Sequence, residues 1–280
     1  MVHDEREGRV KEETPKKNLF AKIGLSLFAL SVCGAVLVLP YVAALEANAL
    51  AAAAQRAHVE VWQALIVSVA QSVVLLGVAV FAGLWASRQL GLRTPLFTAL
   101  YSDAPAPDKT LQTLLLAFGL GVATAIVIAA VDRFVFQNFA SVSLLIERAQ
   151  AGAIHPVRWR GFLASFYGAF DEEILMRLGL LSLLALLFRT IARWGGSDAT
   201  ALPARVFWAA NIVTALAFGL GHLPATAAIA PLTGALIVRA VVLNGAAGLV
   251  FGWLYRRFGL EWAMASHFGA DLVLHVVIGG

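Results

Sequence analysis

The sequence predicts an all-α protein, a polytopic transmembrane helical bundle of about seven spans, with one further apolar segment as a candidate eighth. Of the 280 residues, 60% are hydrophobic and only 14% are charged, whereas soluble domains average roughly 45 to 50% apolar and about 25% charged. The mean hydropathy is +0.81. Apolar runs of the length needed to cross a bilayer, about 20 residues, recur along the chain. This composition indicates an integral membrane protein.

The net charge and the cysteine content exclude several other classes. The formal charge is +4. The basic residues lie between apolar runs and form no single patch, so their distribution indicates the membrane topology and gives no sign of a nucleic-acid partner. Cys33 is the only cysteine. It excludes an intrachain disulfide and a cluster of thiolate metal ligands.

The chain divides into a charged tail, residues 1–18, and a single transmembrane domain, residues 19–280. The tail mixes both signs of charge and contains Pro15, which predicts a solvated and poorly ordered segment. Because the first apolar run is longer than the 7 to 15 residues usual in a signal peptide, it predicts a retained anchor. The expected spans are approximately Ile23–Leu45, Val61–Trp85, Leu111–Val131, Gly161–Phe188, Val206–Leu223, Leu232–Leu254 and Leu260–Ile278.

Two connecting segments have their own signals. Phe134–Ile146 is apolar but has the length of an interfacial or re-entrant segment, which makes it the candidate eighth element. Ala86–Lys109 contains three prolines and predicts a surface loop.

The distribution of basic residues predicts a cytoplasmic amino terminus, because lysine and arginine are in excess on the cytoplasmic side of membrane proteins. Alanine-rich spans and a short basic leader favour a bacterial inner membrane. The residues on the predicted cytoplasmic side are Lys16, Lys17, Arg88, Arg93, Lys109, Arg189, Arg193, Arg205, Arg256 and Arg257.

The fourth span carries an unusual density of charge, in the stretch DEEILMRLGLL from Asp171 to Leu181. Each such charge at the centre of a span costs roughly 2.5 to 3.5 kcal/mol on insertion, so pairing, water or function must offset it. Glu173 and Arg177 are four residues apart and are predicted to form an ion pair on one face. Glu172 points about 100° away from that pair. We therefore interpret Glu173 and Arg177 as structural and Glu172 as a candidate general base.

Two later spans add polar groups at helical spacing. Phe218 and His222 share one face of the fifth span, and His267 and Asp271 share one face of the last span. His275 continues that last stripe one turn further. Each of these groups alone could have a purely structural role, since intramembrane histidines often form interhelical hydrogen bonds worth about 0.6 to 2 kcal/mol. The coincidence of these groups on three late spans favours a site.

Three further polar groups lie at membrane depth, namely Asn211, Asn244 and Arg239. The two asparagines are additional candidate hydrogen-bond donors. Arg239 is close enough to a span end for its side chain to extend to the interface.

These residues resemble the pattern of the CAAX-protease and bacteriocin-processing family of intramembrane endopeptidases, also called Abi-like. That pattern is a double glutamate with an arginine four residues after the second, then Phe-x-x-x-His, then His-x-x-x-Asn or Asp. All three elements occur here in order, on separate predicted spans. The resemblance covers roughly 161–275, while the amino-terminal half matches only in general hydrophobicity.

The resemblance implies a glutamate-dependent protease without a metal cofactor. Glu172 with His222 would activate a water for attack on a peptide carbonyl, and His267 with Asp271 would stabilise the oxyanion. Because an ionised aspartate only accepts hydrogen bonds, Asp271 would be protonated or would orient His267, or else Asn244 or Asn211 would supply the missing donor. Glu173, Arg177, Phe218 and Asn244 are the supporting residues of this interpretation.

Two alternatives use the same side chains. In the first, Glu172, His222 and His267 bind Zn²⁺ with a water in the open position, although no HExxH motif occurs. In the second, the protein is a non-enzymatic transporter, immunity protein or scaffold. The expected partners under the first reading are membrane lipid and a hydrophobic, prenylated or leader-type peptide substrate. The sequence leaves the oligomeric state open.

Overall fold

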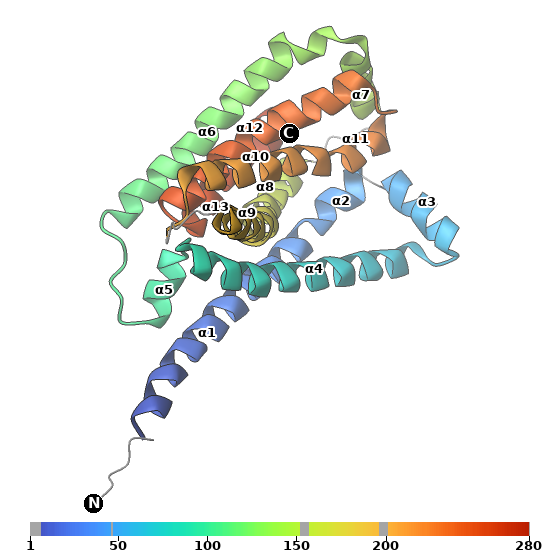
Figure 1. The fold of residues 1–280 in the computed structure, drawn as a ribbon. Coiled ribbons are helices and arrows are strands. Elements are labelled where there is room, and N and C mark those ends of the chain that lie inside the picture. Colours follow the sequence, from blue (N-terminus) through green and yellow to red (C-terminus); the bar gives the residue numbers. More distant parts are fainter. Residues whose placement is uncertain (1–6, 46, 152–156, 196–200, 280) are drawn as a thin grey trace, which may run out of the picture.

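The computed structural model describes residues 7–45, 47–151, 157–195 and 201–279, and its regular structure there is entirely helical (Figure 1). All labelled elements are α-helices except η1, a 3₁₀-helix, and η2 to η4, which are π-helices. In chain order they are α1 (Glu7–Leu37), α2 (Leu39–Leu45), α3 (Ala47–Ala57), α4 (Val61–Leu90), α5 (Pro95–Tyr101), α6 (Thr110–Phe134), η1 (Phe136–Asn138), α7 (Ala140–Ala151), α8 (Arg158–Tyr167), η2 (Gly168–Glu172), η3 (Ile174–Leu181), α9 (Ser182–Trp194), α10 (Ala204–Gly221), α11 (Leu223–Ile229), α12 (Gly234–Arg257), α13 (Leu260–Asp271) and η4 (Leu272–Ile278).

Six helical segments of the described chain are long and apolar enough to cross a membrane, which confirms the predicted polytopic bundle. They are Asn18–Ala44, Val61–Leu90, Thr110–Asn138, Arg158–Trp194, Ala204–Ile229 and Gly234–Arg257. The seventh expected span, 260–278, is helical as α13 and η4 but is not among the six. Most of α13 is buried, including polar residues that lower its hydropathy. The polar side chains of α13 therefore face other helices of the bundle.

Three local predictions are modified by the structure. The loop predicted over 86–109 is wrong in part, because α4 continues to Leu90 and Pro95–Tyr101 forms α5. The tail predicted to be poorly ordered is helical from Glu7 onward in the described chain. The apolar run 134–146 is divided between the end of α6, the short η1 and part of α7, none of which adds a separate span.

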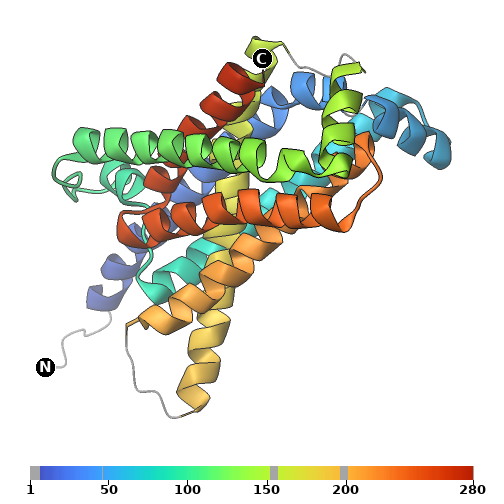
Figure 2. The same cartoon turned by 90° about the horizontal axis from the view of Figure 1, so that it is seen from above.

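One continuous helical rod, residues 158–194, runs through the middle of the bundle as α8, η2, η3 and α9 (Figures 1 and 2). In its most apolar window 44% of the residues are buried, against 17% for the span Val61–Leu90. Helix α4 packs along η3, α10 packs along α12, and α13 packs along α6. At the last of these contacts Gly121 lies directly on the backbone of Ser266, where a side chain would not fit. Three of the four charged side chains of the stretch Asp171–Leu181 are thus buried, namely Asp171, Glu173 and Arg177.

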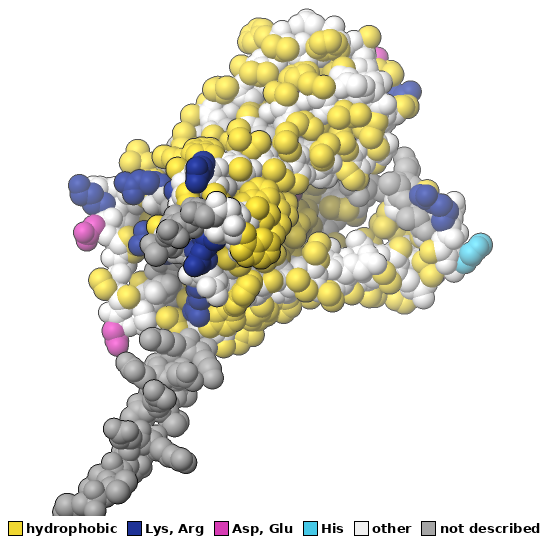
Figure 3. Space-filling model, in the orientation of Figure 1, with side chains coloured by type: hydrophobic (Ala, Val, Ile, Leu, Met, Phe, Trp, Pro, Cys, Tyr) yellow, Lys and Arg dark blue, Asp and Glu magenta, His cyan; other side chains and the backbone are white. Residues whose placement is uncertain are grey.

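The surface separates apolar sides from a basic end. In Figure 3 hydrophobic side chains cover most of the visible face, while Lys and Arg side chains gather around the end where α4 and α12 finish and α10 begins. This asymmetry has the form expected from the distribution of basic residues in the sequence. The assignment of that end to the cytoplasm stays a prediction.

Arg239 does not extend freely to the interface as the sequence suggested. Its Nε donates to Asp132 Oδ1 at 2.6 Å and its Nη2 donates to Asp132 Oδ2 at 2.8 Å. This two-bond pair joins α12 to α6 and neutralises both charges at membrane depth. Only the tertiary structure identifies Asp132 as the partner, because 107 residues separate the two positions.

Candidate active site

The charged stretch of the fourth span winds as a π-helix. Gly168–Glu172 forms η2 and Ile174–Leu181 forms η3, so the double glutamate lies at the junction of two π-helical segments. Wider π-turns inside α-helices are rare and occur frequently at functional sites. Side-chain positions predicted with 3.6 residues per turn therefore hold only approximately in this stretch.

The predicted ion pair of the fourth span is present. Arg177 Nη1 lies 3.0 Å from Glu173 Oε1, and both side chains are fully buried. The guanidinium carbon also lies over the rings of Phe218, at 4.6 Å, and Phe251, at 5.2 Å. Two aromatic faces and one carboxylate thus replace water around this buried cation.

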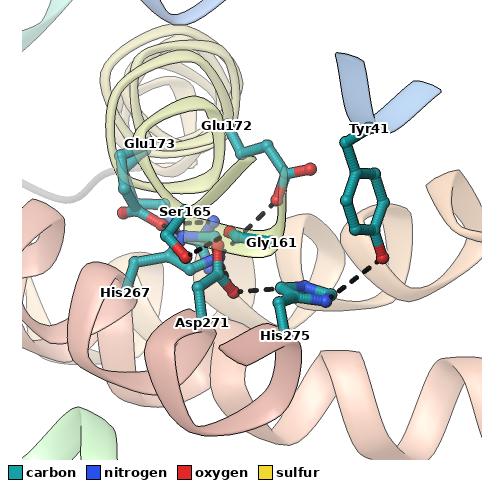
Figure 4. A network of polar contacts seen from close by, with 9 residues as sticks. Tyr41, Gly161, Ser165, Glu172, Glu173, His267, Asp271 and His275 are labelled. Carbon is teal, nitrogen blue, oxygen red and sulfur yellow. Dashed lines mark hydrogen bonds and ion pairs between the residues drawn. The ribbon is translucent and has the colours of Figure 1, made fainter. Parts of the chain in front are cut away.

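His267 is the centre of the polar cluster (Figure 4). Its Nδ1 lies 2.8 Å from Glu173 Oε1, and its Nε2 lies 3.7 Å from Glu172 Oε2. The imidazole stacks on Phe251 with ring centroids 4.6 Å apart. The two neighbouring glutamates therefore approach opposite nitrogens of one imidazole.

The two glutamates have different environments. The Glu173 side chain is fully buried and held by two partners, whereas the Glu172 side chain is 24% exposed and approaches His267 at ion-pair distance only. A partly exposed carboxylate whose oxygens have free lone pairs can accept a proton from a water molecule. A carboxylate enclosed by Arg177 and His267 cannot easily do so. The assignment of Glu172 as the general base stays a prediction.

Asp271 lies between two histidines on the last helix. Its Oδ1 is 3.5 Å from His267 Nε2 and 3.7 Å from His275 Nε2. Tyr41 Oη lies 3.3 Å from His275 Nδ1 and extends the series to α2 (Figure 4). Sequence reasoning missed Tyr41, because a single tyrosine in an apolar run carries no spacing that relates it to the last helix.

The histidine of the second motif lies at a break in its helix. His222 follows the last residue of α10, and α11 starts at Leu223 with Pro224 in its first turn. The His222 Nδ1 lies 2.8 Å from the Phe218 carbonyl oxygen, which can only accept, so Nδ1 carries a proton and donates to this oxygen.

Phe218 contacts both His222 and the centre of the cluster, His267. Its ring contacts His222 at 4.9 Å and His267 at 5.9 Å between centroids. Among the described residues, no hydrogen bond or ion pair joins His222 to Glu172 or to His267. The structure therefore brings Glu172, His267 and Asp271 together, and it connects His222 to them through an aromatic ring.

The two asparagines are engaged elsewhere. Asn244 Nδ2 donates to Ala240 O within its own helix, and Asn211 Nδ2 donates to Leu249 O, which ties α10 to α12. Each of these amide nitrogens carries a second N–H donor, so the three roles left open for Asp271 stay predictions.

Asp171, which the sequence could not place, faces the bundle. Its side chain is buried with 1% residue exposure, and its carboxylate lies directly against Gly34 of α1. Neither oxygen has a hydrogen-bond partner among the described residues. No hydrogen bond or ion pair among the described residues joins it to the cluster around His267.

The described residues contain no group of three or more His, Cys, Asp or Glu side chains arranged to hold a metal ion. Of the set proposed for zinc, Glu172 and His267 lie 3.7 Å apart, and among the described residues no hydrogen bond or ion pair joins His222 to either. Metal independence stays a prediction, and we derive no step through a metal.

Gly168 supplies a test of this packing. A methyl group at this position would meet the Asp271 carboxylate and would lie 3.1 Å from His267 Nε2. We expect Gly168→Ala to displace these groups and to reduce peptide cleavage at least about tenfold, because small misplacements at a reacting centre have large effects. The helical circular-dichroism signal should change little.

The matched control for this substitution is Gly119→Ala on α6, where an added methyl meets no atom within 4 Å. It should leave cleavage unchanged. Equal activity of the Gly168 and Gly119 variants would contradict the packing described here.

The fold and the cluster define a class, that of polytopic membrane proteins with an enclosed carboxylate and histidine site. Residues 154–273 match the family model described as type II CAAX prenyl endopeptidase Rce1-like. The segment that carries the three motifs is thus similar to these CAAX-type membrane proteases, as the resemblance implied. Comparisons with curated proteins and with solved structures found no match.

Proposed function

We propose that this protein is an intramembrane endopeptidase in which Glu172 acts as general base on a water molecule that attacks a peptide carbonyl. The observation that carries this proposal is the contrast between the two glutamates. Glu172 is partly exposed beside His267, while Glu173 is enclosed by Arg177 and His267. The partial exposure of Glu172 supports a water beside this carboxylate in the proposed mechanism.

The other groups receive roles from their contacts. His222 uses Nδ1 to donate to the Phe218 carbonyl, so Nε2 of the neutral ring can accept a hydrogen bond from the attacking water. In this proposal that water lies between His222 and Glu172, which have no direct contact among the described residues. His267 is held by Glu173 on one side and by Asp271 on the other, which favours a protonated imidazole that donates to the developing oxyanion. Donors fixed in advance act strongly in a water-poor site.

The substrate that best fits this setting is a peptide presented at the membrane, with a prenylated or otherwise hydrophobic tail. Support comes from the described family and from the location of the cluster on membrane-spanning helices. The apolar surface around the bundle allows a lipid-modified peptide to approach laterally from the bilayer.

The proposal is tested with purified protein in lipid nanodiscs and fluorogenic peptides that end in a prenylated cysteine sequence, with unprenylated peptides of the same sequence alongside. We expect cleavage of the prenylated peptides that resists metal chelators. Loss of activity on chelation with recovery on added zinc would support the zinc reading instead. Absence of cleavage across the peptide set would favour the non-enzymatic alternative.

A further inference from the structure

A second polar feature lies away from the candidate active site, in a surface hollow of about 350 Å³. The residues that form the hollow lie where α10 begins and α12 ends. Figure 3 shows that basic side chains gather at this end of the bundle. Its lining consists of three arginines, two tryptophans and one alanine, namely Arg93, Arg256, Arg257, Trp208, Trp253 and Ala204.

The three arginines are not neutralised by the described part of the chain. No ion pair involving any of them occurs among the described residues. Arg256 donates through Nη2 to the Leu202 carbonyl and stacks over Phe207, but its Nη1 is buried without a partner in the described structure. Three guanidinium groups around one hollow repel each other, so an anion between them would be stabilised.

The start of α10 adds a further positive contribution. Ala204, the first residue of this 18-residue helix, lines the hollow. The preceding residue is Pro203, and no side chain caps this helix end. Backbone N–H groups of a first turn without a cap, at the positive end of the helix dipole, favour an anionic ligand.

The position of the hollow distinguishes a lipid headgroup from a free anion. Ala204 is the first residue of one candidate span, and Arg257 is the last residue of another, so the hollow lies at the edge of the apolar layer. Trp208 and Trp253 are 41% and 39% exposed there. Tryptophan is enriched at this boundary, where one edge of the indole is apolar and the other meets headgroups.

We propose that the hollow between the start of α10 and the end of α12 binds the phosphate of an anionic phospholipid headgroup, with Arg93, Arg256 and Arg257 as its ligands. The site is independent of the proposed peptidase chemistry. It would fix the depth of two spans at the side of the bilayer that carries the basic residues.

The proposal is tested on the full chain, delipidated in neutral detergent, by native mass spectrometry with added phosphatidylglycerol or phosphatidylcholine. We expect retained adducts with phosphatidylglycerol and few with phosphatidylcholine. The variant Arg93→Gln with Arg257→Gln removes two exposed ligands and keeps the structural contacts of Arg256. It should weaken phosphatidylglycerol binding about 10- to 30-fold, given the usual contribution of each basic residue to anionic-lipid binding.

The matched control is Lys109→Gln with Arg193→Gln, two exposed basic residues predicted on the same side that do not line the hollow. It should keep wild-type binding. An equal loss in both double variants would reduce the effect to overall charge and overturn the site. Equal binding of phosphatidylglycerol and phosphatidylcholine would also overturn the site. If inorganic phosphate alone bound as strongly as phosphatidylglycerol, the assignment of a lipid headgroup would be overturned.

Discussion

Replacement of Glu172 by glutamine is expected to abolish peptide cleavage while leaving the bundle intact. Loss of a general base reduces the rate about 100- to 10,000-fold in characterised enzymes. The substitution keeps the size of the side chain but removes the carboxylate that would take a proton from water. Because Glu172 makes no buried ion pair with Arg177, unfolding in detergent should be close to that of the wild type.

The measurement is the initial rate on a fluorogenic prenylated peptide, with thermal unfolding recorded on the same preparation. Glu147→Gln is the matched control, since Glu147 is an exposed carboxylate on α7. Cleavage by the Glu172 variant at the wild-type rate would refute its assignment as the base. A loss of cleavage accompanied by unfolding would instead assign it a structural role.

Replacement of Arg177 or Glu173 by alanine alone is expected to destabilise the fold by about 3 to 5 kcal/mol, because breaking a buried ion pair leaves one charge without compensation. Both side chains are fully buried, and Arg177 also contacts two aromatic rings. The prediction is checked by equilibrium unfolding in mixed detergent micelles.

Removal of both charges should be less damaging than removal of one. The double variant Glu173→Gln with Arg177→Met keeps approximate volume and leaves no isolated charge, so it should recover part of the stability lost in either single variant. Arg193→Ala, an exposed arginine near the end of the same rod, serves as the control and should unfold like the wild type. Single variants as stable as this control would contradict the structural role of the pair.

Several features of the fold were predictable because they depend on local properties. The length of an apolar run decides whether a helix can cross a bilayer, and this is why six of the expected spans coincide with helices of sufficient length. The pairing of Glu173 with Arg177 follows from helical spacing and survives the change to a π-helix. The stripe of His267, Asp271 and His275 was predictable for the same reason.

Other features could not be read from the chain. The sequence gives no indication that Asp171 lies against Gly34, that Tyr41 approaches His275, or that Phe218 contacts both His222 and His267. The π-helical winding of the fourth span also lacks a spacing signal. Each of these depends on how helices distant in sequence pack against each other.

Composition and spacing alone predicted a polytopic membrane protein, its approximate spans and three motifs that resemble those of CAAX-type proteases. These are properties of composition and of spacing within one helix, which act over a few residues. The tertiary structure decided which glutamate is enclosed and which is open, since that depends on the position of His267 on a helix about 90 residues further along the chain. It also decided that three separated arginines surround one hollow, because only packing brings the ends of different spans together.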